Sequence, residues 1–260
     1  MFKNLFEFAD GASDEPDTDF IKTFFAEIHK FAFSQLLDEA CVKAYGKGID
    51  ALVEAKQYKD VVRCLLGENG LNYGKLPKGL LLFHKYADGA RTPLEEHLVE
   101  GAMYASGKDG KVNVHFTVSP EHRKMFEALV AEKAPEFGKK FRVEFSATFS
   151  EQKQSTDTLA ATADNEPFRT EDGNMLFRPG GHGALIENLN DLDADVIFIK
   201  NIDNVVPDRL KGDTVDYKKL LAGVLVSLQK KAFEYLTILD SGVYTHAQLE
   251  EMIRFVQRNL

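Results

Sequence analysis

The chain has almost none of the residues that cross-link a small protein. Only Cys41 and Cys64 are cysteines among its 260 residues, and they form no CxxC motif or Cys/His cluster. This scarcity argues against a disulfide framework and a structural zinc site, and it fits a reducing compartment. The histidines form no HxH or HxxxH pair, so we expect no histidine metal site.

Long apolar stretches and a surplus of positive charge are also missing. The longest apolar runs, such as Leu80–Phe83 and Val196–Ile199, are far too short to span a bilayer, and the first residues lack the organisation of a signal peptide. We therefore expect a cytoplasmic protein with no membrane partner. With 32 basic and 41 acidic residues, the net charge of −9 argues against a nucleic-acid partner, although a local basic pocket could still hold one nucleotide.

Two common catalytic motifs are absent as well. The sequence contains neither GxxxxGKS/T nor GxSxG. These absences exclude the phosphate-binding P-loop and the nucleophile elbow of α/β-hydrolases.

The length suits one large domain, and we expect a single domain over residues 1–260. Its pattern changes twice along the chain. Residues 1–75 are mainly helical, residues 76–204 alternate between strands and helices, and residues 205–260 form C-terminal helices.

Periodicity predicts the individual elements. Apolar residues at helical spacing predict a helix over Phe20–Leu37. Val112–Val118 and Phe141–Phe149 alternate as strands do, and Val196–Ile202 is a continuous apolar strand of the kind found in parallel sheets. This alternation predicts an α/β fold with a mostly parallel central sheet flanked by helices and with ligands at the carboxyl ends of its strands. A short strand is also expected over Leu80–Phe83, and helices over 49–66, 94–105, 119–133, 183–189, 215–239 and 246–259.

The first candidate site is the run Arg178–Gly183, RPGGHG. Gly180, Gly181 and Gly183 would let the backbone approach a ligand and present N–H groups to it, and His182 lies among them. The helix expected next would add the positive end of its dipole. A tight connection that needs positive φ explains the same glycines, and the sequence leaves both interpretations open.

The second candidate site is Lys200–Asn204, at the end of the apolar strand Val196–Ile202. An acidic residue such as Asp203 at a strand's carboxyl end is where an α/β enzyme holds Mg²⁺, and Asn204 adds an amide. The alternative is that Asp203 and Asn204 only form a turn.

Two further stretches contain polar side chains near expected strands. Lys78 precedes the Leu80–Phe83 strand and could reach a phosphate, although the local residues alone favour a solvated loop lysine. The long irregular stretch Ser150–Pro179 is of a length that is usually functional or disordered. Its first part, Ser150–Thr158, has hydroxyls and amides that suit a polar ligand, as they also suit any loop.

Together these stretches resemble a known family. Phe177–Asn204, Lys78–Ala105 and Ser155–Ala160 resemble an uncharacterised bacterial family of the domain-of-unknown-function kind, placed among nucleotidyltransferase-like GT-A, or Rossmann-like, folds. The wider class includes the sugar-nucleotide pyrophosphorylases. The resemblance covers essentially the whole chain.

The resemblance implies a role for each candidate residue. Lys78 would contact a phosphate, the Gly181–Gly183 turn with His182 would contact the nucleotide base, and Asp203 would hold Mg²⁺. Gly180 and Asn204 would also bind the nucleotide. Lys78 and Asp203 would then be the catalytic residues, and we expect them within about 15 Å of each other, the span of a nucleotide-sized site.

One departure from that class concerns its Gly-rich phosphate loop. Met1-Phe2-Lys3 resembles the tail of this loop, as though the preceding strand and glycines were missing, and we expect the family to extend beyond Leu260. The sequence therefore leaves open whether this chain is an enzyme. The first hypothesis is a Mg²⁺-dependent transfer between a nucleoside triphosphate and a sugar 1-phosphate. The alternatives are a domain that binds a nucleotide sugar or a protein without turnover, and a fragment that folds only within a longer chain.

Overall fold

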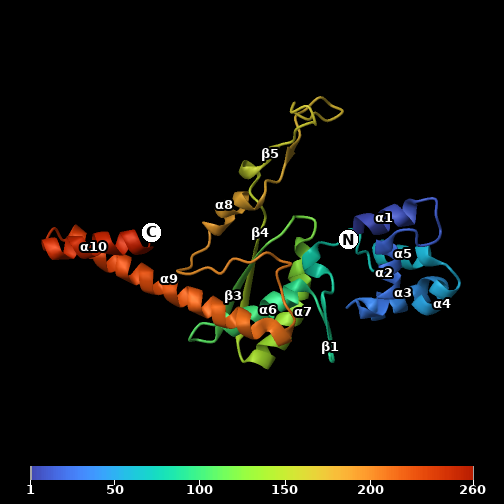
Figure 1. Ribbon diagram of the computed structural model, residues 1–260, viewed down its shortest axis with the longest axis horizontal. Helices are drawn as coiled ribbons and strands as arrows, with labels where there is room; N and C mark the ends of the chain where they lie inside the picture. The colour runs from blue at the N-terminus through green and yellow to red at the C-terminus, as the bar shows by residue number, and fades with distance from the viewer. Residues whose placement is uncertain (1, 260) are drawn as a thin grey trace. The chain divides into compact units, whose positions relative to one another are not determined.

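A computed structural model describes residues 2–259 as a mixed α/β structure with many helices and small sheets (Figure 1). Contacts divide the chain into two compact units. The first unit runs to Asp193 and includes Lys200–Pro207, and the second joins Ala194–Ile199 to the chain from Asp208 onward. The division reflects where contacts are dense, and the expectation of one domain over residues 1–260 stays a prediction.

The first unit begins with a helical segment, residues 2–66, whose helices bury their apolar faces against one another. Leu37 and Leu65 are completely inaccessible to solvent, and the stacked rings of Phe31 and Phe33 have centroids 5.0 Å apart. The elements of this segment are α1 (Phe2–Asp10), α2 (Asp19–Ala26), the 3-10 turn η1 (Ile28–Lys30), α3 (Ser34–Tyr45), α4 (Ile49–Glu54) and α5 (Tyr58–Leu66).

Two helices expected to be continuous are interrupted. Phe20–Leu37 is divided between α2 and α3 by the turn η1. The helix expected over residues 49–66 is divided between α4 and α5, where Lys56 has a φ of 58° in the left-handed region. Apolar periodicity identifies the side chains that face the core, but it does not show where the hydrogen bonds of a helix stop. One apolar stripe can therefore run over two helices.

A parallel pair of strands lies in the other part of the first unit. β3 (Lys111–Thr117) and β4 (Glu144–Ser150) pair along their whole length, so both strands begin and end together. This confirms the strands predicted over Val112–Val118 and Phe141–Phe149. The second begins later than predicted because α7 (Arg123–Phe141) continues through Phe141.

Two helices cover one face of this pair. α7 connects β3 to β4, and α6 (Pro93–Tyr104) contacts both β3 and α7. α6 begins with Pro93 and a capping box between Thr92 and Glu95, as a proline and an acidic first turn predict. The core between helices and sheet is formed by Leu94, Leu98, Val99, Phe116, Val118, Phe126, Val130 and Phe137.

The smaller sheets do not join β3 and β4. β1 (His84–Tyr86) pairs with β2 (Gly89–Arg91), and β5 (Thr158–Leu159) pairs with β6 (Phe177–Arg178), both antiparallel. Each sheet of residues 2–259 thus has two strands. The mixed α/β class is confirmed, whereas the broad parallel central sheet and the GT-A fold are not shown.

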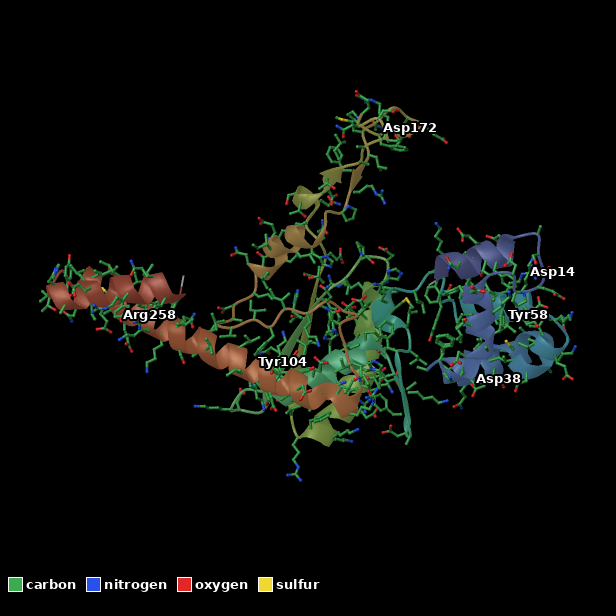
Figure 2. The ribbon with its side chains drawn as sticks, in the orientation of Figure 1. Asp14, Asp38, Tyr58, Tyr104, Asp172 and Arg258 are labelled. Atoms are coloured by element: carbon green, nitrogen blue, oxygen red, sulfur yellow. The ribbon has the colours of Figure 1, made fainter. Side chains whose placement is uncertain are left out.

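The long polar stretch after β4 folds into a hairpin rather than remaining without structure. Within the loop that connects β5 to β6, backbone bridges between Ala161 and Pro167 and between Arg169 and Met175 close two smaller, successive hairpins. In Figure 2 Asp172 lies near the far end of this hairpin. The hairpin is followed by the short helical turns η4 (His182–Leu185) and α8 (Ile186–Leu189), close to the helix expected over residues 183–189.

Two predicted strands are wrong. Leu80 ends the 3-10 turn η2 (Lys78–Leu80), and regular pairing starts only at β1, so Leu80–Phe83 is not a strand. Val196–Ile202 is not paired as a strand either. An apolar run has a tendency to be buried, but it becomes a strand only when a neighbour takes up its backbone N–H and C=O groups.

The second unit consists mainly of two helices, as predicted for the end of the chain. α9 (Lys211–Asp240) and α10 (His246–Asn259) are joined by the hydrogen bond from Tyr235 Oη to Glu251, at 2.6 Å, and by packing of the Tyr235 and Phe255 rings. Many of its apolar side chains are exposed. None of the helices described over residues 2–259 has the length and apolar character needed to cross a membrane.

Candidate functional site

Two residues 125 positions apart, Lys78 and Asp203, form an ion pair in the first unit. Lys78 Nζ donates to Asp203 Oδ2 at 2.5 Å. The lysine side chain is 66% exposed and the aspartate side chain 34%, so both groups remain open to a ligand. The hydrogen bond from Lys78 lowers the pKa of Asp203 below its ordinary value, against the opposing effect of burial. The carboxylate is therefore ionised at neutral pH.

His182 is the third predicted residue at this place. An electrostatic contribution from His182, the smallest of the causes, also lowers the pKa of Asp203 and places His182 in the neighbourhood of this carboxylate. Lys78, His182 and Asp203 come from η2, η4 and the segment after Lys200, and the structure shows a direct contact between Lys78 and Asp203. Lys78 and Asp203 thus lie well within the expected distance of about 15 Å, while the convergence of all three residues on one cleft and their roles stay predictions.

The contact between the two chain segments depends on a glycine. A Cβ at Gly79 would lie 2.7 Å from the ring of Phe126 and 3.0 Å from Cγ1 of Ile202. Only a residue without a side chain lets the Lys78 turn lie so close to α7 and to Ile202. Because Gly79 packs against Ile202, the preceding residue Lys78 lies within hydrogen-bonding distance of Asp203, the residue after Ile202.

Asp203 also belongs to a tight turn. The N–H of Asn204 donates to the carbonyl oxygen of Asn201 at 3.0 Å, and Asn204 itself is exposed. The interpretation of this run as a turn is confirmed. The turn does not explain the ion pair with Lys78, so the two interpretations of Asp203 are compatible.

The Gly-rich run is attached to the end of β4 by a residue that the sequence did not single out. In the amide orientation that satisfies both of its groups, Gln152 Oε1 accepts from the N–H of Gly180 at 2.7 Å, and Nε2 donates to the carbonyl of Gly180 at 3.3 Å. Gln152 lies in the stretch Ser150–Thr158, and its composition indicated a polar ligand but not this backbone contact.

The three glycines of the run have different reasons to be glycine. A Cβ at Gly180 would lie 2.9 Å from the carbonyl oxygen of Thr156, so packing requires a glycine there. Gly181 and Gly183 have no atom within 4 Å of the position of a Cβ. None of the three has positive φ, so the interpretation as a turn that needs left-handed backbone is wrong. The fold itself does not require glycine at 181 and 183.

A network of polar side chains fixes the carboxyl ends of β3 and β4. His115 Nε2 and Ser150 Oγ lie 2.8 Å apart, and His115 Nδ1 lies 2.8 Å from Thr148 Oγ1. Asn188 on α8 donates to Ser150 Oγ at 2.9 Å and to the carbonyl of Glu151 at 2.7 Å. Burial lowers the pKa of His115. The network therefore joins the neutral histidine and the helical turn after the Gly-rich run to the sheet.

The Lys78 side of the site is attached to the end of β3. His122, just before α7, lies with Nε2 3.0 Å from the carbonyl oxygen of Lys75 and with Nδ1 2.8 Å from Ser119 Oγ. Both parts of the candidate site are thus bound to the carboxyl ends of the parallel strands, where α/β proteins hold their ligands.

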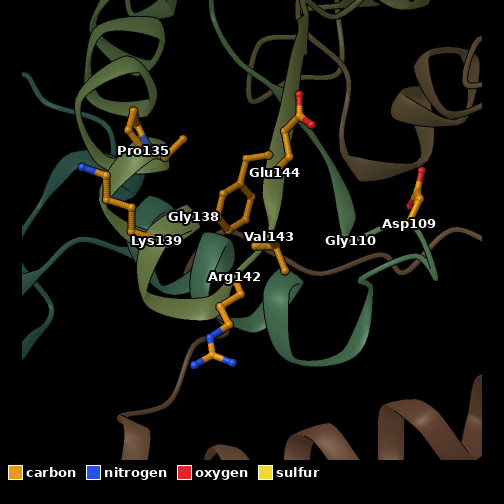
Figure 3. Close-up of a pocket in the computed structure, with 10 residues that line it drawn as sticks. Asp109, Gly110, Pro135, Gly138, Lys139, Arg142, Val143 and Glu144 are labelled. Carbon is orange, nitrogen blue, oxygen red and sulfur yellow. The ribbon is translucent and has the colours of Figure 1, made fainter.

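A shallow pocket of about 670 Å³ lies elsewhere, beside the amino ends of β3 and β4 (Figure 3). Its lining includes Gly110, Lys139, Arg142 and Glu144. With about 3.3 Å per strand residue, the carboxyl ends are roughly 20 Å away. This pocket mixes opposite charges and is separate from the candidate site.

A metal at Asp203 would have few protein ligands. Over the described residues 2–259, no group of three or more His, Cys, Asp or Glu side chains is arranged to hold a metal ion. Mg²⁺ commonly takes only one or two carboxylates and completes its shell with phosphate oxygens and water. The donor set fits Mg²⁺ only when a phosphate ligand is bound with it.

Comparison with protein families assigns the chain. Residues 1–260 match the family described as "Domain of unknown function (DUF4301)". The chain belongs to this family. The predicted membership of a domain-of-unknown-function family is therefore confirmed, while the nucleotidyltransferase-like fold stays a prediction. Comparison with curated proteins and with solved structures gave no match.

Proposed function

We propose that this DUF4301 chain binds a nucleoside triphosphate with Mg²⁺ and a sugar 1-phosphate, and transfers the nucleotidyl group to the sugar phosphate. An oxygen of the sugar 1-phosphate forms a bond to the α-phosphorus, and the bond from that phosphorus to the pyrophosphate oxygen breaks. The products are a nucleotide sugar and pyrophosphate. The observation that carries this proposal is the ion pair between Lys78 and Asp203, two residues far apart in the sequence, with a smaller electrostatic contribution from His182.

The residues of the site suit a reaction that needs positioning and neutralised charge more than an acid or a base. Lys78 offers a mobile ammonium to the phosphates, since its side chain is 66% exposed. Asp203 would hold Mg²⁺, which supplies further positive charge to the phosphates when bound. The open space over Gly181 and Gly183 suits a flat base that lies against the backbone, and His182 stands between these glycines in the sequence. Asn204, next to Asp203 in the sequence, would also contact the nucleotide.

The ion pair has a consequence for binding. Lys78 Nζ occupies one oxygen of Asp203, so a cation at Asp203 competes with the ammonium for the same carboxylate. A triphosphate removes this competition because it offers Lys78 a different anionic partner. Mg²⁺ and nucleotide should therefore bind better together than either does alone.

The test is a thermal-shift panel of nucleoside triphosphates and nucleotide sugars, each with and without Mg²⁺. We expect at least one nucleotide to raise the melting temperature more with Mg²⁺ than without it, and Mg²⁺ alone to have little effect. Asp203→Asn should abolish the Mg²⁺-dependent part and the release of pyrophosphate. If nucleotides stabilise the wild type and Asp203→Asn equally, with or without Mg²⁺, the metal role is wrong.

A second candidate function is binding of a nucleotide sugar without turnover. It is favoured by the engagement of Asp203 with the Lys78 ammonium, and by the finding that no three or more His, Cys, Asp or Glu side chains among residues 2–259 are grouped to hold a metal ion. In that case a nucleotide sugar should stabilise the protein without Mg²⁺, and no pyrophosphate should be released from any triphosphate.

A further inference from the structure

The turn that carries Asp203 is held by two side chains of α6. Lys200 Nζ donates to Glu100 Oε2 at 2.5 Å, and His97 Nε2 donates to the carbonyl oxygen of Ile202 at 3.0 Å. We call Glu100, Lys200 and His97 the α6 anchor. Its contacts hold Lys200 and Ile202, the residues on either side of Asn201, and Ile202 immediately precedes Asp203.

The α6 anchor is less exposed than the ion pair between Lys78 and Asp203. Glu100 is completely inaccessible, and the Lys200 side chain is 14% exposed. Burial lowers the pKa of His97, so it is a neutral donor to the Ile202 carbonyl at neutral pH. A carboxylate buried in this way is costly unless a cation compensates it, and this cost keeps Lys200 in place.

The exposed pair needs such support. An ion pair between exposed side chains contributes little by itself, because ordering two flexible side chains and screening by water offset the attraction. Lys78 and Asp203 are 66% and 34% exposed. Something other than their own attraction must therefore fix the backbone that presents Asp203.

We propose that Glu100, Lys200 and His97 are positioning residues that hold Asp203 opposite Lys78. The catalytic meaning of this placement rests on the proposed function, whereas the placement itself does not. Lys200 neighbours the candidate carboxylate in sequence and has a charge suited to a phosphate, yet its ammonium is directed into the protein toward Glu100. Its task is to place the turn, not to contact the ligand.

The experiment measures how fast Lys78 is acetylated by an acetyl N-hydroxysuccinimide ester in the full chain, using mass spectrometry and the exposed Lys108 as internal reference. An ammonium held by a carboxylate must leave that partner before its amine reacts. Asp203→Asn removes the partner and sets the upper limit, an acceleration of about two- to five-fold, the factor that corresponds to a partly exposed ion pair.

The decisive variant is the double substitution Glu100→Gln/Lys200→Met, which removes both charges and leaves no unpaired carboxylate in the core. We expect it to give more than half of the acceleration seen with Asp203→Asn, while Lys200→Arg keeps the wild-type rate. Lys59→Met is the matched control, because the Lys59 side chain is also 14% exposed and pairs with an aspartate, Asp14, in the helical segment. It should leave Lys78 unchanged.

A second variant covers a failure of the double variant to fold. His97→Leu removes the donor to the Ile202 carbonyl without leaving a buried charge, and it should accelerate Lys78 acetylation, whereas His97→Gln keeps an N–H donor there and should stay near the wild-type rate. The proposal is overturned if Asp203→Asn accelerates Lys78 while the anchor variants do not. It is also overturned if Asp203→Asn has no effect, because the ion pair would then not exist in solution.

The assay contains no nucleotide, so its outcome is separate from that of the proposed function. A wild-type protein that no nucleotide stabilises would remove the proposed function and leave the acetylation result standing. The opposite result is also possible: the double variant binds nucleotide with the same dependence on Mg²⁺ as the wild type, and Lys78 is acetylated at the wild-type rate. That result would rule out the positioning role of the α6 anchor.

Discussion

The helical segment and the candidate site belong to the same unit but differ in how far their side chains are buried. In the helical segment, apolar side chains such as Leu37 and Leu65 are completely buried, so truncating them removes packing contacts and lowers the stability of the fold. At the site, Lys78 and Asp203 remain partly exposed and are bound mainly to each other. The segment is built to be stable, and the site is built to exchange its partners.

The same difference in packing divides the glycines of the first unit into two groups. Gly79 and Gly180 are glycine because backbone or rings lie where a Cβ would be, so they belong to the packing. Gly181 and Gly183 face open space. Residues that the fold does not need are the best candidates for contact with a ligand. Substitutions should therefore distinguish residues that stabilise the fold from residues that bind the ligand.

The largest effect is expected in the helical segment. Leu37→Ala should lower the free energy of unfolding by about 2–5 kcal/mol, because a fully buried leucine leaves a cavity. Its neighbour Leu36 is 45% exposed, and Leu36→Ala should cost less than about 0.5 kcal/mol. Urea unfolding of both variants measures the contrast. Equal losses would show that the buried and exposed faces of α3 are wrongly assigned.

Gly79→Ala should have the next largest effect. The added methyl group meets the Phe126 ring and Ile202, so we expect a loss of about 1–3 kcal/mol from overpacking. Gly181→Ala is the control, because its methyl group would have no neighbour within 4 Å. Lys78 acetylation should rise in Gly79→Ala, since the turn is pushed away from Asp203. A fully stable Gly79→Ala variant would contradict the close packing of η2 on α7.

A smaller effect is expected from pH. Because burial lowers the pKa of His115, the unfolded chain binds a proton there before the folded chain does. Unfolding free energy therefore falls as pH drops below the ordinary histidine pKa of about 6.5, and the full contribution is present above it. His115→Gln should reduce this slope between about pH 5 and 7, by less than about 1.4 kcal/mol per pH unit. Parallel stability curves for the variant and the wild type would argue against the neutral imidazole.

The smallest effect on stability is expected at the centre of the site. Asp203→Asn, Gly181→Ala and Gly183→Ala should each change the free energy of unfolding by less than about 1 kcal/mol, because an exposed pair contributes little and the glycines face open space. All three should nevertheless weaken the nucleotide-dependent rise in melting temperature. Variants that are fully stable and bind every nucleotide like the wild type would move these residues out of the site.

The sequence predicts local features of this molecule better than pairing between distant segments. The alternation along Val112–Val118 and the proline at the start of α6 depend only on neighbouring residues, and both predictions hold. The strand predicted over Val196–Ile202 failed because strand formation depends on a partner that the run itself does not specify.

The candidate site shows the same limit. Lys78, His182 and Asp203 could be named because each follows a recognisable local pattern, and the resemblance connected them. Gln152 and Glu100 could not be named in this way. Gln152 acts through the backbone of Gly180, and Glu100 acts through Lys200, so their importance exists only once the chain has folded.

The equal length and common register of β3 and β4 restrict how this family can change in evolution. Side chains alternate along a strand, so deletion of one residue within β4 would turn Ser150 to the face of α7 and expose Phe149. The hairpin between β5 and β6 has no such restriction, because residues can be gained or lost near Asp172 without moving the strands. Among family members, length differences should therefore accumulate in the hairpin and be rare in the two parallel strands.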